Sequence, residues 1–465
     1  MVRQRTVSTR PKIAIQYILD ESKLKGTPGQ NDFFKRVRAA IRGLGWEIAE
    51  FGPDIDAETI SANAMSCAGQ KFAAMLGVVF AGSSARQVAL LGKFNGPVGV
   101  WFFPGTEWGG MASAGAGIGY LLDESRNNPS LTVTSIWGDP DDEETLERLQ
   151  CFGHATHVAF AMKHEKIGLI GGSNYDGMPA GNWHPDVLTS KLGPSYMEID
   201  ITVLERALES VRPVEAGALV RRLSNAGMKL PDEDRSMDII RESARVSLAV
   251  ENLQNRFGLT GVAINCYGST DPGVFGGVLG CCGANACLKA HALGTVVIGC
   301  EADVVLTAQQ LIFKHLVGTV PCAAEPWKLD TVTGVLIAGT CSGPADLAEA
   351  PHKVRVEAGT LGSPYDTGVL GVCLPEIKEQ DAVVTRIYGR ELDRMLVATG
   401  RFLGSDSGTI VGRLSLKVEL DNPDGFLDRG MVGNYYTILP TESLDRDVSR
   451  VEALCEVLGI EAERV

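Results

Sequence analysis

Two carboxylates, Glu301 and Asp303, follow directly on an apolar run at residues 296–299. The run has the composition of a buried strand, and a helical pattern begins immediately after Asp303. Open α/β sheets place their ligands at the carboxyl ends of such strands. A buried acid is costly unless a metal ion, a proton or a cation compensates it. The pattern therefore predicts that Glu301 and Asp303 belong to an active site, as acid–base groups or as metal ligands.

The segment before these acids is unusual because it contains no Asp or Glu between Pro272 and Cys300. It carries instead the adjacent pair Cys281 and Cys282. A cysteine with a lowered pKa can act as a nucleophile or bind a metal. A buried free cysteine, in contrast, commonly packs as a small apolar residue. Both interpretations stay open, and Cys281 and Cys282 are candidate catalytic residues.

A loop at residues 101–110 has the composition of a sugar-binding segment. It contains Trp101, Glu107 and Trp108. Indole rings stack on the apolar face of a sugar, and a carboxylate accepts hydrogen bonds from its hydroxyl groups. The alternative is an ordinary turn between tryptophans of the core.

Two further polar residues are candidates for substrate binding. Asn174 follows a glycine turn at the end of the apolar run 167–172, where backbone N–H groups can face an anion or a sugar hydroxyl. His184, in the sequence NWHPD, is a candidate ligand or a structural histidine. The glycines at residues 115–119 are interpreted as tight turns or close helix packing, with a phosphate or sugar site as the alternative.

The composition argues against several classes of partner. The chain has 465 residues and a net charge of −14, and no basic stretch offers a surface for nucleic acid. No apolar run approaches the roughly 20 residues that cross a membrane, and no signal peptide is evident. The 11 cysteines include no C-x-x-C pair and are typical of reduced thiols. We predict a cytoplasmic protein that acts on a small molecule.

The periodicity predicts an α/β protein with three domains. Apolar strands alternate with amphipathic helices in residues 1–165, which indicates a doubly wound parallel sheet. A second strand–helix series fills residues 166–340, and residues 341–465 form a β-rich, barrel-like domain. The fold class is therefore two doubly wound, Rossmann-like α/β domains followed by a β-rich C-terminal domain. The strands expected in the first domain are Lys12–Leu19, Trp46–Phe51, Ala73–Phe80 and Pro97–Phe103.

Five motifs follow one another along nearly the whole chain. They are PGTEWGGM from Pro104, IGLIGGSNYDGM from Ile167, LGPSYMEIDITVLERAL from Leu192, GCEADVVLTA from Gly299 and GNYYTILP from Gly433. In this order and spacing they resemble the L-fucose/L-arabinose isomerase superfamily, particularly its fucose-isomerase-like branch. The resemblance implies two Rossmann-like domains and a C-terminal barrel-like domain, in a homotrimer or homohexamer with sites between subunits.

The same resemblance implies a reaction and roles for particular residues. The family interconverts aldoses and ketoses through an enediol, usually with manganese, which polarises oxygens while carboxylates move the proton. Asp303 matches the family's metal-binding aspartate, and Glu301 occupies the acidic position just before it. Trp101 and Glu107 fall in the loop that reaches the site of a neighbouring subunit.

Two positions depart from the family's pattern. The acid-free run lacks the family's catalytic glutamate, and Asn434 and Tyr435 stand where the family has a ligand histidine. Tyrosine is a poor replacement for imidazole on a manganese-type ion. We therefore expect Asn434 and Tyr435 to bind substrate. Mn²⁺ or another divalent metal on Asp303 and Glu301 is an open alternative, and no nucleotide cofactor is expected.

Three functions follow from these observations. The principal prediction is an aldose–ketose isomerase, an intramolecular oxidoreductase acting on a free, modified or phosphorylated sugar, in which Cys281 or Cys282 replaces the lost acid. The second is a metal-independent carbon–carbon lyase or a transaldolase-like transferase of a ketose; a Schiff-base version needs a lysine, and Lys289 and Lys314 are nearest in sequence. The third is a non-catalytic sugar-binding homologue.

Overall fold

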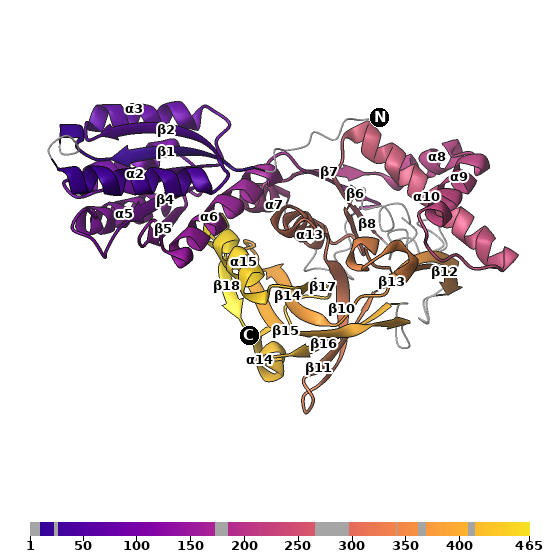
Figure 1. The fold of residues 1–465 in the computed structure, drawn as a ribbon. Helices are drawn as coiled ribbons and strands as arrows, with labels where there is room; N and C mark the ends of the chain where they lie inside the picture. Colours follow the sequence, from indigo (N-terminus) through magenta and orange to yellow (C-terminus); the bar gives the residue numbers. More distant parts are fainter. Residues whose placement is uncertain are drawn as a thin grey trace. The chain divides into compact units, whose positions relative to one another are not determined.

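The computed structural model describes residues 10–22, 27–172, 185–265, 297–340, 342–360, 369–407 and 414–465. The chain divides into two compact units, and both combine helices with strands (Figure 1). The first unit comprises the residues up to 161 together with 449–461, and the second comprises residues 162–448 with 462–465. Among the helices of the described ranges, none has both the length and the apolar content that crossing a membrane requires.

The first unit is built on a parallel sheet of five strands in the order β2-β1-β3-β4-β5. All residues of the central strand β3 are buried, as expected for a strand that is covered by helices on both faces. The parallel sheet predicted for this part of the chain is therefore confirmed. Its strands are β1 (Lys12–Ile18), β2 (Glu47–Asp54), β3 (Ala74–Val79), β4 (Val98–Phe102) and β5 (Val133–Trp137).

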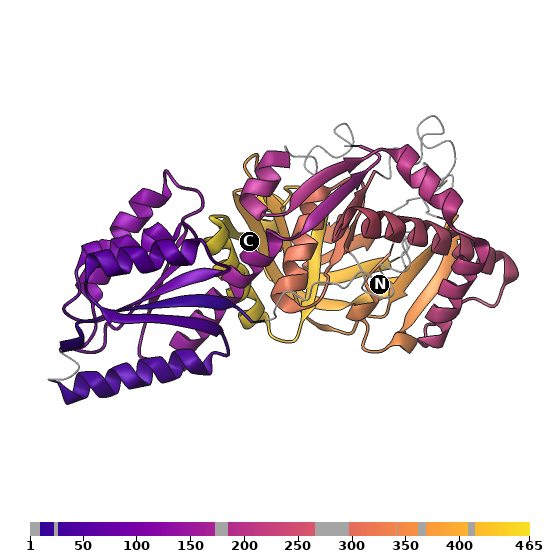
Figure 2. The ribbon, with the colours of Figure 1, turned by 90° about the horizontal axis from the view of Figure 1, so that it is seen from above.

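Helices cover both faces of this sheet (Figure 2). The helices α2 and α6 pack with an aromatic core on one face, and α3, α4 and α5 pack on the other. In α2 the buried residues recur at helical spacing, which is why this segment forms an amphipathic helix. The helices are α2 (Pro28–Gly43), α3 (Ala57–Ala68), α4 (Ala85–Ala89), the 3-10 helix η1 (Leu90–Phe94), α5 (Met111–Ser125) and α6 (Glu143–Met162).

The glycines at residues 115–119 lie inside α5, so the turn expected there is wrong. Close helix packing, the other part of that interpretation, is confirmed at Gly117. A Cβ atom at Gly117 would lie 2.3 Å from Cβ of Val88 in α4, and only glycine allows the two helices to approach so closely. Gly117 therefore serves packing within the first unit, whereas a Cβ atom at Gly115 or Gly119 would meet no atom within 4 Å.

The second unit contains a parallel sheet of four strands in the order β7-β6-β8-β9. The helix α13 follows β9 and is buried along most of its length, whereas α10 buries one face and exposes the other. The strands are β6 (Lys166–Ile170), β7 (Ser195–Ile199), β8 (Gly261–Ile264) and β9 (Val297–Gly299). The helices are α7 (Pro185–Leu192), α8 (Ile201–Ser210), α9 (Pro213–Asn225), α10 (Asp234–Phe257) and α13 (Val304–Val317).

The second unit also contains a closed barrel of six antiparallel strands, in the order β14-β17-β10-β11-β16-β15 with β15 pairing back to β14. The predicted β-rich C-terminal region is confirmed, but the barrel already begins with β10, before residue 341. Its strands are β10 (Cys322–Asp330), β11 (Val335–Thr340), β14 (Gln380–Tyr388), β15 (Arg394–Ser407), β16 (Leu414–Leu420) and β17 (Tyr436–Thr441).

Shorter elements accompany the barrel. The strand β18 extends the sheet beside β15, and β12 and β13 form a separate two-stranded sheet. These elements are β12 (Val354–Thr360), β13 (Val369–Pro375), β18 (Glu461–Arg464), the 3-10 helices η3 (Ala345–Leu347) and η4 (Pro351–Lys353), and the helices α14 (Pro423–Arg429) and α15 (Leu444–Leu458).

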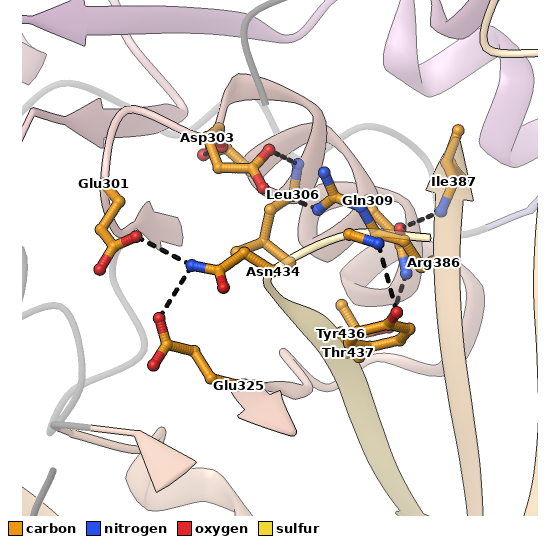
Figure 3. A network of polar contacts seen from close by, with 12 residues as sticks. Glu301, Asp303, Leu306, Gln309, Glu325, Arg386, Ile387, Asn434, Tyr436 and Thr437 are labelled. Carbon is orange, nitrogen blue, oxygen red and sulfur yellow. Dashed lines mark hydrogen bonds and ion pairs between the residues drawn. The ribbon is translucent and has the colours of Figure 1, made fainter. Parts of the chain in front are cut away.

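A buried polar network fastens α13 to the barrel (Figure 3). Nε2 of Gln309 lies 2.8 Å from Oγ1 of Thr385 in β14 and 2.7 Å from Oγ1 of Thr437 in β17. The backbone N–H of Ile387 donates to Oε1 of Gln309 at 2.7 Å. Because buried polar groups are costly without partners, these bonds fix the start of α13 against two barrel strands.

Candidate functional site

The turn between β9 and α13 is strained, and Glu301 lies in it. Glu301 and Ala302 both adopt the left-handed backbone conformation, with φ of 54° and 62°. This conformation costs roughly 1–2 kcal/mol for a residue with a Cβ atom. The backbone N–H of Ala302 donates to the carbonyl of Ile264 at 2.8 Å, which helps to hold the turn. Strain of this kind concentrates where a structure must aim a side chain.

The side chain of Glu301 is hydrogen-bonded to Asn434. The same Asn434 amide is hydrogen-bonded to a second carboxylate, Glu325 (Figure 3). Nδ2 of Asn434 donates to Oε2 of Glu301 at 3.2 Å and to Oε1 of Glu325 at 3.0 Å. Asn434 is exposed and both glutamates are half-buried, so that the cluster can be reached by a ligand. Residues far apart in sequence thus form one polar site in the second unit.

The register of the barrel explains why Glu325 reaches this place. In the pairing of β10 with β17, Ala324 lies opposite Tyr436. The next residue of β10, Glu325, therefore lies beside the segment that precedes β17, which carries Tyr435 and Asn434. The barrel thus brings Glu325 next to Asn434, and the strained turn brings Glu301 to the same amide.

Burial raises the pKa of Glu325, although Tyr435, Asn434 and Trp327 act as hydrogen-bond donors that favour its ionised form. The raised pKa means that this carboxyl holds a proton more readily than an ordinary glutamate does. Two carboxyl groups in different environments form the arrangement that separates an acid from a base in proton transfer. Glu325, whose pKa is raised by burial, has the character of the acid in such an arrangement.

Two tyrosines hold the segment that carries Asn434. Tyr435 is buried and packs against Leu306 of α13. The hydroxyl of Tyr436 donates to the carbonyl of Gly430 at 2.6 Å and accepts hydrogen bonds from two backbone N–H groups of the same loop. Asn434 is therefore presented by a segment that is anchored on both sides. The predicted role of Tyr435 in binding substrate stays a prediction; the structure shows its packing against α13 and its influence on the pKa of Glu325.

Asp303 is fully buried, and both of its carboxylate oxygens have partners within the chain. Oδ1 accepts the backbone N–H of Leu306 at 2.7 Å and caps α13. Oδ2 forms an ion pair of 2.7 Å with Arg386 of β14, whose side chain is also fully buried. A metal ion on Asp303 would lie close to the guanidinium group, and the two positive charges would repel each other.

The described residues do not fit the manganese site that the resemblance implies. Asp303 is engaged by Arg386, and the described ranges contain no group of three or more His, Cys, Asp or Glu side chains placed to hold a metal ion. Asn434 turns a hydrogen-bond donor, rather than an oxygen, toward Glu301. The acid–base role of Glu301 and its ligation of a metal together with Asp303 both stay predictions.

The predicted residues of the loop at 101–110 lie in the first unit. Trp101 is fully buried, and its indole N–H donates to the carbonyl of Gly138 at 3.2 Å, so it packs in the core. Trp108 is half-buried and packs against the same aromatic cluster. Glu107 is exposed. The structure does not place these three residues relative to Glu301, because they belong to a different unit.

Four further candidates lie outside the described residues. These are Cys281, Cys282, Asn174 and His184. Their predicted roles in catalysis and substrate binding stay predictions.

Glu325 and Trp327 are site residues that the sequence interpretation missed. They flank Pro326 in the sequence AEPW, within an otherwise strand-like run. A proline inside a strand marks an edge or a β-bulge, and bulges recur next to active sites. The register of β10 against β11 does shift between Pro326 and Lys328. This proline was the signal that could have drawn attention to its neighbours.

The strain at Glu301 leads to a stability prediction. We expect Glu301→Gly to raise the free energy of unfolding by roughly 1 kcal/mol relative to Glu301→Gln, because glycine adopts the left-handed conformation without steric cost. Both variants remove the carboxylate, so both should lose activity. Denaturant unfolding of the two variants, followed by circular dichroism, measures the difference. Equal unfolding midpoints would show that the turn stores no strain.

The chain was also compared with known proteins. No family model matches the sequence, and no curated protein matches it.

Proposed function

We propose that this chain is a carbohydrate-processing enzyme, an aldose–ketose isomerase that works through an enediol-type intermediate. Glu301 and Glu325 are the proposed proton-transfer groups. The observation that carries the proposal is that these two carboxyl groups, from two different elements, converge on the amide of Asn434, and that burial raises the pKa of Glu325. The resemblance in sequence to the fucose-isomerase-like branch supports the choice of reaction.

The proposed chemistry needs a base for a carbon-bound proton and an acid for a carbonyl oxygen. Glu301 removes the proton from the carbon next to the carbonyl, and Glu325 donates a proton to the carbonyl oxygen, which gives the enediol. Glu301 then returns its proton to the former carbonyl carbon, and Glu325 takes the proton of the neighbouring hydroxyl group. Atoms and electrons balance, since both glutamates end as they began. Asn434 holds the two carboxyl groups at a fixed separation.

The lysine-dependent alternative receives less support from the described residues. Lys314 lies in the last turn of α13, next to His315, whose Nε2 is 2.7 Å from Oε1 of Glu165. Asp303 caps the start of α13, directly after the turn that contains Glu301. At 1.5 Å per residue, Lys314 lies roughly 16 Å along the helix from that cap. Lys289 lies outside the described residues. Of the two lysines named for a Schiff-base lyase or transaldolase, the structure thus describes only Lys314, and it lies at the far end of α13 from Glu301.

A substrate screen tests the proposed function. The purified full chain is incubated with five- and six-carbon aldoses and ketoses, free and phosphorylated, after EDTA treatment and again after addition of Mn²⁺, and products are separated by chromatography. We expect at least one sugar to be converted to its isomer. If no sugar reacts under any condition but one raises the unfolding temperature, the chain is a sugar-binding homologue instead. Borohydride trapping of a covalent adduct would favour the lysine-dependent lyase.

Three expectations accompany this proposal. We propose a cytoplasmic location and a homo-oligomeric assembly, on the strength of the cysteine usage and of the sequence resemblance. We also propose that the oligomer is a trimer or a hexamer, and light scattering would measure its mass.

A further inference from the structure

An irregularity in β10 sets Trp327 apart from the rest of the strand. Pro326 pairs with Ala338 of β11 and Lys328 pairs with Ile337, so Trp327 is the extra residue of a β-bulge. A bulge bends its strand locally and changes the direction of the side chain. Trp327 follows Glu325 by two residues in the same strand, so the bulge lies directly beside the site.

Trp327 is one of two exposed tryptophans among the described residues. Its exposed fraction is 42%, whereas Trp101 is fully buried and Trp46 and Trp108 are half-buried. Trp137 has a similar exposed fraction of 46%, but the guanidinium group of Arg148 covers its ring at 3.9 Å from the centroid. A large apolar ring exposed to water next to polar side chains commonly marks a binding surface.

The neighbours of this ring have the chemistry that recognises a polyhydroxylated ligand. Glu325 is an acceptor for hydroxyl groups, and the amide oxygen of the exposed Asn434, whose Nδ2 donates to both glutamates, is an acceptor as well. Sugars present an apolar face of C–H bonds together with a rim of hydroxyl groups, and an indole ring beside such polar groups matches both.

We infer that Trp327 is a specificity-determining residue of this site, whose indole ring carries the C–H face of a sugar or sugar alcohol while Glu325 and Asn434 bind its hydroxyl groups. The inference rests on the proposed function, because it concerns the same site, but it addresses binding and not proton transfer. Trp327 lies two residues from the proposed acid Glu325 in β10, so a sugar carried on its ring would have its carbon chain beside that carboxyl group.

Isothermal titration calorimetry of the full chain tests the inference without requiring turnover. The probes are ribitol, xylitol, arabinitol, glucitol and galactitol, which cannot isomerise. We expect Trp327→Ala to weaken the binding of the best alditol by roughly tenfold, which corresponds to about 1.4 kcal/mol, and Trp327→Phe to retain binding within about threefold. Trp137→Ala is the matched control, with an equally exposed ring in the first unit, and should bind as the wild type does.

Kinetics separate this inference from the proposed function. With a sugar that the enzyme converts, Trp327→Ala should raise KM by roughly tenfold and change kcat by less than about threefold. If Trp327 had a purely structural role, the substitution would instead lower the unfolding temperature and leave KM unchanged. Wild-type binding that persists in Trp327→Ala overturns the inference and leaves the proposed function intact. Binding that depends on Trp327 without turnover of any sugar overturns the proposed function alone. Wild-type protein that binds no alditol contradicts both.

Discussion

Replacing Glu325 by Gln should lower kcat for isomerisation by roughly two to four orders of magnitude, because proton transfer by a positioned side chain contributes about that much. Gln keeps the size of the side chain and can still accept the hydrogen bond from Asn434, but it cannot give up a proton. KM should change little. Initial rates on the sugar identified in the substrate screen measure the effect, and an unchanged unfolding temperature verifies that the variant is folded.

The pH dependence of the wild type supplies an independent check on Glu325. Because burial raises its pKa above that of the unfolded chain, the protonated form that donates to the carbonyl oxygen is present at low pH and is lost as the pH rises through the raised value. Glu325 also stabilises the folded state. This contribution to the free energy of unfolding is fully present below the pKa of the unfolded chain, and it is lost as the pH rises through the raised pKa of the folded state. Activity should therefore fall on the alkaline side with the titration of Glu325. Glu376, an exposed glutamate paired with Lys353, is a control position whose Gln variant should keep the wild-type profile.

Removing the charge of Asp303 should cost about 3–5 kcal/mol of stability, because Arg386 would then be buried without a counter-charge. The informative variant is Asp303→Asn, since its side-chain oxygen can still accept the N–H of Leu306 and cap α13. The loss of stability is thus assigned to the ion pair and not to the cap. Denaturant unfolding followed by circular dichroism measures it.

A double variant completes this test. Replacing Arg386 by Met together with Asp303→Asn removes both charges, and we expect the stability to recover by several kcal/mol relative to Asp303→Asn alone. If Asp303→Asn instead unfolds as the wild type does but loses activity that Mn²⁺ restores only in the wild type, Asp303 is a metal ligand. That result would contradict the structural role assigned to it here.

The elements of the sheets were predictable because their signals are local. The strands of the first unit appear in the sequence as apolar runs separated by amphipathic helices, and the structure places β1 to β4 within a few residues of the expected bounds. The turn at Glu301 was also predictable, since an apolar strand runs into a residue of the N-cap type, Asp303, and then a helix. These features depend on neighbours in the chain.

The composition of the site depended on pairings that no local pattern reports. Glu325 and Asn434 meet only because β10 pairs with β17, which lies more than 100 residues later in the chain. The partner of Asp303 is similarly distant, although an arginine inside the apolar strand β14 was a sign that a buried counter-charge must exist. With that partner known, the described contacts of Asp303 are the ion pair and the helix cap, and the second carboxyl group beside Asn434 is Glu325. The catalytic and metal-binding roles of Asp303 stay predictions.

Deuterium exchange tests the central claim, that Glu301 and Glu325 move a proton between adjacent carbons of a sugar. The wild type and Glu325→Gln are incubated in D2O with the sugar identified in the substrate screen, and the carbon-bound deuterium is located by NMR. We predict one deuterium at the carbon that neighbours the carbonyl in the wild type and none above background in Glu325→Gln within the same time. Equal incorporation by the variant would contradict the account. So would isomerisation by the wild type that leaves the product without carbon-bound deuterium even after incubation long enough for the proton held by Glu301 to exchange with D2O.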